Sequence, residues 1–335
     1  MTVSKAKIIA VTGATGAQGG GVVNIMKKTT GWKVRAITRN TESEAAKKLA
    51  QEENVEVVKA DFDDEASLKA AMEGVSAIFA VTNWWEPLFQ QKTQHEAGEI
   101  EERHGMNLAR AAASISTLEH YLWSTQPSSK LRLTEEQRKG GFEVPHMDYK
   151  AKVDERIRKE LPDLAAKTTY LYFGYYPQNM AFFPLLKPFE LPGAYGQHVQ
   201  LIASSPEAKI LLAGDMSVNP GIWVRQILKT GKPVMGKYTN VALERWSFSQ
   251  MAEKWTEITG KRCVVMQVSE EDWTNIWGPA GRELAWQFKF GEMVDPWGSD
   301  GREGEFVSWK ELGIEESDVV GFEGTIRGLQ KAGFF

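Results

Sequence analysis

Short apolar runs alternate with polar, alanine-rich stretches through the first half of the chain. Each run is nearly continuous in its apolar character, which is typical of a strand covered on both faces. Strands alternating with helices at this spacing indicate βαβ units with right-handed connections, and so a parallel, doubly wound α/β sheet. The predicted strands are 7–12, 33–38, 55–58, 76–81, 120–124 and 170–173, and the predicted helices are 20–28, 42–51, 65–72 and 91–114.

The pattern changes after about residue 180, where prolines break the chain into loops. Asn219 is predicted to cap a helix that has Pro220 at its first position and ends before Gly231. Ser247 and Gln250 have the capping-box spacing before a helix at 251–258, and 262–268 reads as a strand. We therefore expect a cofactor-binding domain at 1–180, to which some later segments return. A smaller substrate- or partner-binding portion is expected at 181–335.

Composition and charge narrow the class of protein. The chain has 335 residues, 42% of them hydrophobic and 25% charged, which are globular values. Its 40 basic and 44 acidic residues give a net charge of −4, so we expect no direct nucleic-acid binding. One cysteine, Cys263, excludes a disulfide framework, and the histidines show no metal-binding spacing. No apolar run is long enough to span a membrane, and we expect a cytoplasmic protein, or also a nuclear one if it is a regulator.

A glycine-rich loop lies between the first predicted strand and helix. Its glycines have the spacing G-x-x-G-x-x-G, and this context favours a dinucleotide-binding turn over a plain strand–helix connection. The first glycine permits a tight turn, the second lets backbone N–H groups approach a pyrophosphate, and the third lets the helix pack closely. The helix N-terminus adds aligned N–H groups. The predicted pyrophosphate-binding residues are Gly13, Thr15, Gly16, Ala17, Gln18 and Gly19.

The residues after the next strands indicate which dinucleotide binds. An NAD site usually has an acid after the second strand, whereas this chain has Arg39 and Asn40. Arg39 can hold a 2′-phosphate bidentately, so we predict NADP(H) in preference to NAD(H), the alternative being a solvated arginine. Asp61 and Phe62 are expected near the adenine, although Asp61 could equally cap the next helix. Thr82 and Asn83 are expected to line the cleft beside the ribose and pyrophosphate.

Together these segments resemble the NmrA-like family, an atypical branch of the short-chain dehydrogenases/reductases. The resemblance covers nearly the whole chain and implies a Rossmann-type NADP(H)-binding domain with a smaller α/β C-terminal portion. Some members resemble redox sensors that bind partner proteins, and others resemble isoflavone or quinone reductases. One departure is the presence of two acids, Glu42 and Glu44, after Arg39, which we expect to weaken phosphate binding. The matching segments are 13–20 (GATGAQGG), 34–40 (VRAITRN), 81–86 (VTNWWE), 146–153 (HMDYKAKV) and 215–218 (DMSV).

The resemblance also implies a catalytic frame that this chain has altered. Standard members carry Ser, Tyr and Lys, with Tyr four residues before Lys. Here the frame is Ser124, His146 and Lys150. His146 and Lys150 share a helix face, so Lys150 could hold the nicotinamide ribose while His146 acts as a general acid. The alternatives are that His146 only packs or caps, or that solvent protonates a conjugated product.

The aromatic segment 170–179 completes the predicted site. The resemblance implies that this segment lies beside the nicotinamide, so Phe173 or Tyr175 is expected to pack on the nicotinamide ring and Asn179 to contact its carboxamide. Trp84 and Trp85 are expected to wall an apolar substrate pocket or a partner surface, with core packing as the alternative. These features favour an NADPH-dependent reductase of a carbonyl, enone or quinone with a hydrophobic, aromatic-lined pocket. The alternative is a non-catalytic NADP(H) redox sensor that binds a protein partner such as a transcription factor.

Overall fold

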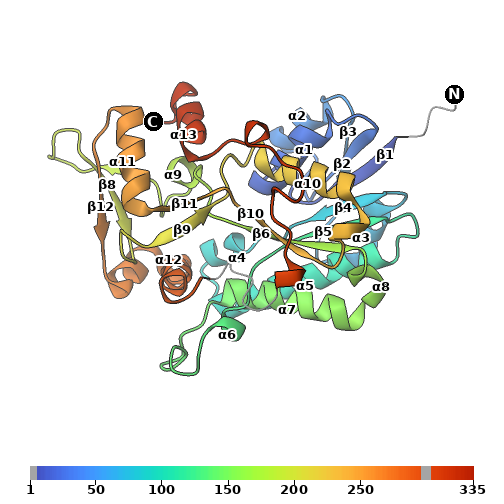
Figure 1. Ribbon diagram of the computed structural model, residues 1–335, viewed down its shortest axis with the longest axis horizontal. Helices are drawn as coiled ribbons and strands as arrows, with labels where there is room; N and C mark the ends of the chain where they lie inside the picture. Colours follow the sequence, from blue (N-terminus) through green and yellow to red (C-terminus); the bar gives the residue numbers. More distant parts are fainter. Residues whose placement is uncertain (1–5, 296–302) are drawn as a thin grey trace.

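The computed structural model describes residues 6–295 and 303–335. Its centre is a seven-stranded sheet in the order β10-β6-β5-β4-β1-β2-β3, with every neighbouring pair parallel (Figure 1). The doubly wound α/β prediction is therefore confirmed. The strands are β1 (Lys7–Val11), β2 (Trp32–Thr38), β3 (Val55–Lys59), β4 (Ala77–Ala80), β5 (His120–Thr125), β6 (Thr168–Phe173) and β10 (Tyr238–Val241).

Helices cover both faces of this sheet. One apolar core joins the sheet to α1 and α10, and a second joins its other face to α3, α5, α7 and α8. Both β10 and α10 come from the second half of the chain, so that half contributes to the sheet and to one of its layers (Figure 1). The helices of this part are α1 (Ala17–Met26), α2 (Glu44–Ala50), α3 (Glu65–Met72), α5 (Gln94–Ala113), α6 (Ser129–Arg132), α7 (Pro145–Glu160), α8 (Pro162–Ala165) and α10 (Asn219–Thr230).

The remaining elements form a smaller lobe, on the left in Figure 1, with its own apolar core. It contains an antiparallel pair, β11 with β9, and a three-stranded sheet in the order β12-β8-β7. Its elements are α4 (Trp85–Phe89), α9 (Asn179–Phe182), β7 (Phe189–Glu190), β8 (His198–Ile202), β9 (Lys209–Leu212), β11 (Glu244–Ser247), α11 (Phe248–Thr259), β12 (Cys263–Gln267), α12 (Glu270–Met293) and α13 (Phe322–Lys331). The core of this lobe includes Trp84 and Leu88, so the segment after β4 ties the two parts together.

Two predicted helix starts differ from the structure. Helix α1 begins at Ala17, three residues before the predicted start. The glycines inside it allow close packing, since a Cβ on Gly19 or Gly21 would lie 2.3 or 2.1 Å from a backbone oxygen. The prediction that Asn219 caps α10 is wrong, since Val218 is the capping residue. The Asn219 side chain instead donates to the carbonyl oxygens of Ala213 and Val320, and tertiary contacts thus override the local cap. The capping box of Ser247 and Gln250 is confirmed.

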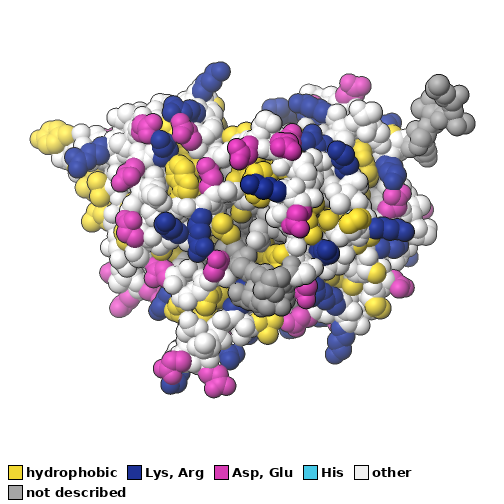
Figure 2. Space-filling view, viewed as in Figure 1, with side chains coloured by type: hydrophobic (Ala, Val, Ile, Leu, Met, Phe, Trp, Pro, Cys, Tyr) yellow, Lys and Arg dark blue, Asp and Glu magenta, His cyan; other side chains and the backbone are white. Residues whose placement is uncertain are grey.

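The surface mixes charges of both signs. On the face drawn in Figure 2, the described Lys and Arg side chains are interspersed with Asp and Glu, without a broad patch of one sign. Within residues 6–295 and 303–335, no helix combines the length and apolar character that crossing a bilayer requires. The same described residues contain no cluster of His, Cys, Asp and Glu able to hold a metal ion.

Candidate functional site

The glycine loop has the geometry of a phosphate-binding turn. Gly13 has a φ of +58°, which a side chain rarely adopts, and a Cβ there would lie 2.8 Å from Val81. A Cβ on Gly19 would lie 2.3 Å from the carbonyl oxygen of Gly13, so only glycine lets α1 approach the turn. The Gly16 N–H donates to that same oxygen at 2.8 Å, and α1 begins at the next residue. The free N–H groups of the first turn therefore open onto the end of the sheet.

A cleft of about 760 Å³ runs along the carboxyl ends of the parallel strands from this loop. Two buried side-chain oxygens at it, Oε1 of Gln18 and of Gln126, have no hydrogen-bond partner, which suits a ligand carrying N–H or O–H groups. Asp61 lines the cleft and does not cap the next helix, because Asp64 does so. The predicted residues that the structure brings together along the cleft are Gly13, Thr15, Gly16, Ala17, Gln18, Gly19, Arg39, Asn40, Asp61, Phe62, Thr82, Asn83, Ser124, His146 and Lys150.

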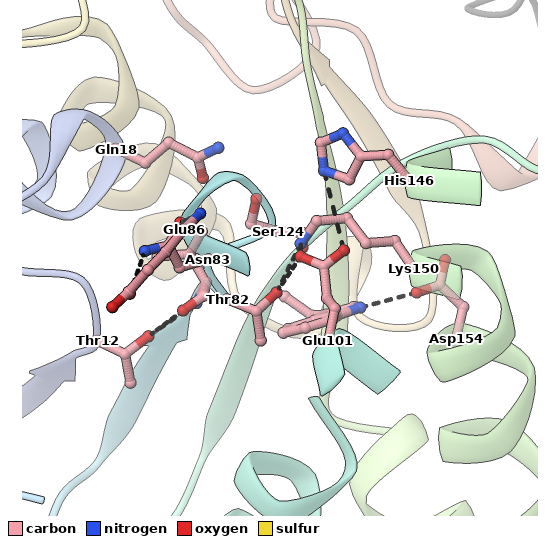
Figure 3. Close-up of polar contacts among 12 residues, drawn as sticks. Thr12, Gln18, Thr82, Asn83, Glu86, Glu101, Ser124, His146, Lys150 and Asp154 are labelled. Carbon is pink, nitrogen blue, oxygen red and sulfur yellow. Dashed lines mark hydrogen bonds and ion pairs between the residues drawn. The ribbon is translucent and has the colours of Figure 1, made fainter. Parts of the chain in front are cut away.

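Lys150 lies at the floor of this cleft and is nearly fully buried. Its ammonium group donates to the Thr82 hydroxyl at 2.9 Å and to the Ser124 carbonyl at 3.1 Å, and it forms an ion pair with Glu101 Oε1 at 3.2 Å (Figure 3). Two of the three N–H groups of the ammonium therefore donate to protein acceptors, and the contact with Glu101 is an ion pair. A ribose hydroxyl would compete with these partners for Lys150.

Glu101 of α5 is the main residue that sequence reasoning missed. Its carboxylate has no exposed surface, and Oε1 also accepts a hydrogen bond from the Thr82 hydroxyl at 2.7 Å. Its Oε2 has no hydrogen-bond partner and lies 3.9 Å from His146 Nε2 (Figure 3). Along the sequence Glu101 is one acid among several on a charged helix. No local signal separates it from its solvated neighbours.

His146 is held from several sides. Its ring stacks on Trp84 with centroids 4.7 Å apart, and the Gln287 amide nitrogen lies 3.1 Å from Nδ1. Because an amide nitrogen only donates, Nδ1 accepts and the ring proton sits on Nε2, which faces Glu101. Burial lowers the pKa of His146 to about 4. The ring is neutral at pH 7, and a neutral imidazole is a poor general acid.

The buried carboxyl group of Glu283 helps to position His146. Glu283 of α12 accepts hydrogen bonds from the His146 backbone N–H at 3.2 Å and from the Gln287 amide at 3.1 Å. Burial raises the pKa of Glu283 to about 8, so the group carries its proton at neutral pH. The arrangement fixes where His146 sits without adding a second charge beside Glu101.

Arg39 lies at one end of the cleft, directly after β2. Its guanidinium donates to the Glu86 carboxylate at 2.6 Å, and the Asn83 amide donates to the same oxygen at 3.0 Å. The pKa of Arg39 is raised, chiefly by this hydrogen bond and less by the charges of Asp61 and Asp63. The predicted phosphate-binding arginine therefore already holds a carboxylate that sequence reasoning did not connect with it.

A second cavity of about 310 Å³ adjoins the cleft. Phe173, Tyr175 and Asn179, predicted beside the nicotinamide, line this cavity rather than the cleft. Trp84 is buried in the core of the smaller lobe and borders the cleft alone, whereas Trp85 lines both spaces. The residues that line both the cleft and the cavity are Ala17, Trp85, Gln126, His146 and Tyr176.

The fold and the cleft define a Rossmann-like α/β protein with a dinucleotide-type glycine loop at the carboxyl ends of its strands. The chain belongs to the NmrA-like family, whose model matches residues 5–304. The resemblance seen in the sequence is thereby confirmed.

Curated relatives carry the same family name. An NmrA-like family domain-containing oxidoreductase of Aspergillus campestris is 28% identical over 319 residues, covering 88% of this chain and 86% of the relative. One of Aspergillus hancockii is 34% identical over 152 residues, which is 45% of this chain and 42% of that protein. The match thus spans less than half of some of these relatives.

Solved structures agree in fold. NmrA, described as a negative transcriptional regulator and solved in complex with NADP, matches with a TM-score of 0.77 at 21% identity, covering 98% of this chain and 97% of that one. A triphenylmethane reductase of Citrobacter sp. in complex with NADP(H) matches with a TM-score of 0.69 at 18% identity, covering 96% and 99%. At these identities the likeness establishes the fold.

Proposed function

We propose that this protein is an NADPH-dependent reductase that acts on a flat, apolar carbonyl, enone or quinone. The observation that carries the proposal is the shared wall between the cleft and the second cavity, which includes Gln126 and His146. A molecule in the cavity would meet the inner end of a dinucleotide lying along the cleft. Rossmann-type proteins commonly place substrate against cofactor in this way.

The residues along the cleft suit NADP(H) in chemical character. The glycine-loop N–H groups would hold the pyrophosphate, Arg39 the 2′-phosphate, and Lys150 a ribose hydroxyl in competition with its protein partners. When bound, NADPH supplies a hydride. Support from relatives is indirect: NmrA has been solved with NADP and also with NAD, and triphenylmethane reductase with NADP(H).

The lining of the second cavity favours the substrate class. Its walls include Trp85, Phe183 and Phe288, together with the cations Lys209 and Arg245. Among the described residues that line it, none is an Asp or Glu. At about 310 Å³ it lies at the small end of ligand pockets. An apolar space of this size suits one or two fused rings better than a sugar or a nucleotide.

The proton supply favours conjugated acceptors within that class. His146 is neutral at pH 7, and the Lys150 ammonium donates to Thr82 and Ser124 and is paired with the Glu101 carboxylate. A reduced quinone or enone can take its proton from water, whereas a simple ketone benefits more from a poised acid. We therefore place quinones and enones ahead of simple ketones.

The test is the loss of NADPH absorbance with a panel of quinones, enones, ketones and imines. Leu211→Trp, on β9 in the cavity wall but outside the cleft, should reduce turnover at least tenfold while NADPH affinity changes less than twofold. Arg39→Ala should weaken NADPH binding much more than NADH binding. Equal losses for both cofactors would contradict the phosphate assignment.

A second candidate function is a non-catalytic NADP(H) sensor that binds a protein partner. The protein partners of Lys150 and the neutral His146 favour it, because neither side chain is ready to deliver a proton. NmrA is described as a transcriptional regulator, which shows that the fold can serve such a role. Tight NADPH binding without oxidation across the whole panel would favour this alternative.

A further inference from the structure

The ion pair of Arg39 and Glu86 spans the adenosine end of the cleft. Arg39 follows β2 and Glu86 lies on α4 after β4, while β1 with its glycine loop lies between these two strands in the sheet. The pair therefore bridges the strand end across which a dinucleotide must lie. Both side chains are partly exposed, at 57% and 38%, so incoming ions can compete for them.

Glu86 is not a freely rotating surface acid. The oxygen that accepts from Arg39 at 2.6 Å also accepts from the Asn83 amide at 3.0 Å. The Glu86 backbone N–H in turn lies 3.4 Å from Asn83 Oδ1. This Asn83 contact positions the carboxylate in front of the guanidinium, where it takes the place that a phosphate oxygen would take.

The other acids near Arg39 do not make its guanidinium more available to a phosphate. Asp63, the acid next to Phe62, is held by Arg103 at 2.9 Å and by His104 at 3.1 Å. Asp61 adds a further negative charge to the same end of the cleft. A 2′-phosphate arriving here therefore meets an arginine that is already neutralised.

We propose that Glu86 is a specificity-determining residue that competes with the cofactor's 2′-phosphate for Arg39. This inference rests on the proposed function, which assigns NADP(H) to the cleft. NAD(H) has a hydroxyl at the 2′ position and can bind with the ion pair intact. NADP(H) must take Arg39 from Glu86 and leave that carboxylate close to a phosphate of like charge, so Glu86 lowers the preference that Arg39 creates.

The two acids that follow Arg39 in the sequence are a different case. Glu42 forms an ion pair with Lys47 at 3.4 Å, and its backbone N–H is bound by the Asn40 side chain. Glu42 is 79% exposed, and the acids that raise the pKa of Arg39 most are Glu86, Asp61 and Asp63. Glu42 is thus a matched control, an acid close to Arg39 along the chain that does not hold it.

The experiment is calorimetric titration of the full chain with NADPH, NADH and 2′,5′-ADP at fixed ionic strength. Removing one competing charge at this partly exposed site should strengthen phosphate binding about five- to tenfold. Glu86→Gln should therefore tighten NADPH and 2′,5′-ADP by that factor and change NADH less than twofold. Glu42→Gln should change all three less than twofold, and the gain from Glu86→Gln should be smaller in an Arg39→Ala background, where only the repulsion between Glu86 and the phosphate is removed.

Three outcomes contradict the inference. Unchanged or weaker NADPH binding in Glu86→Gln would show that the carboxylate does not compete. Equal tightening of NADPH and NADH would show a general effect of charge rather than phosphate selection, and an undiminished gain in the Arg39→Ala background would show that Glu86 does not compete for Arg39. Binding of both cofactors with an unchanged ratio would overturn only this inference, whereas no binding of either by the wild type would overturn the proposed function as well.

Discussion

Replacing Lys150 by methionine should destabilise the protein, because the buried carboxylate of Glu101 loses its ion-pair partner. Glu101 has no exposed surface, and its Oε1 would keep only the Thr82 hydroxyl, while Oε2 has no hydrogen-bond partner even in the wild type. Breaking a buried ion pair by removing one partner costs about 3–5 kcal/mol, because the remaining charge is uncompensated. In a chain of this size, about 2 °C of melting temperature is lost per kcal/mol, so we expect a drop of roughly 6–10 °C.

The double variant Lys150→Met/Glu101→Gln distinguishes the cost of leaving the Glu101 charge unpaired from the cost of losing the lysine side chain. It removes both charges, and the amide can still accept from Thr82. We expect it to recover most of the loss, to within about 1–2 kcal/mol of the wild type. Lys152→Met is the matched control, because Lys152 joins the same helices α7 and α5 through Glu102 at 2.7 Å but is 54% exposed. It should cost less than about 1 kcal/mol.

Urea unfolding at pH 7, followed for the wild type and these variants, measures the free energy of unfolding in each case. A loss below about 1 kcal/mol in Lys150→Met would refute the uncompensated-charge reasoning, and so would a double variant less stable than the single one. The result also bears on kinetics. A loss of turnover in a Lys150 variant can be assigned to chemistry only when Lys150→Met/Glu101→Gln is stable and equally inactive.

Two further predictions concern the glycine loop and the buried carboxyl of α12. Gly19→Ala places a Cβ 2.3 Å from the Gly13 carbonyl oxygen and should weaken NADPH binding at least tenfold by calorimetry, whereas Gly20→Ala, with its nearest atom at 3.5 Å, should change it little. The pKa of Glu283 is about 8 in the folded protein against 4.5 ordinarily, so its stabilising contribution is complete below pH 4.5 and is lost as the pH rises towards 8. Glu283→Gln should therefore lose less stability than the wild type between pH 5 and 8 in urea unfolding. An identical slope would contradict the raised pKa.

Much of the architecture was readable from local pattern. The inner strands β4, β5 and β6 of the central sheet are buried at every position, so they form runs that need no tertiary information to recognise. The last strand of the sheet, β10, was not among the predicted strands, because its four residues, Tyr238–Val241, form only a short run. Helix starts failed where a side chain had a better distant partner, as Asn219 has in Ala213 and Val320.

The candidate site also has a part that the sequence predicts and a part that only the tertiary structure shows. The sequence by itself determined the glycine loop and the strand ends, because only certain residues permit a tight turn and the carboxyl ends of parallel strands share one edge. Tertiary structure alone decided that Glu101 and Glu86 hold Lys150 and Arg39. A carboxylate on a polar helix looks the same in sequence whether it is solvated or buried against a cation. Its role depends on which distant chain segment the fold brings within about 3 Å.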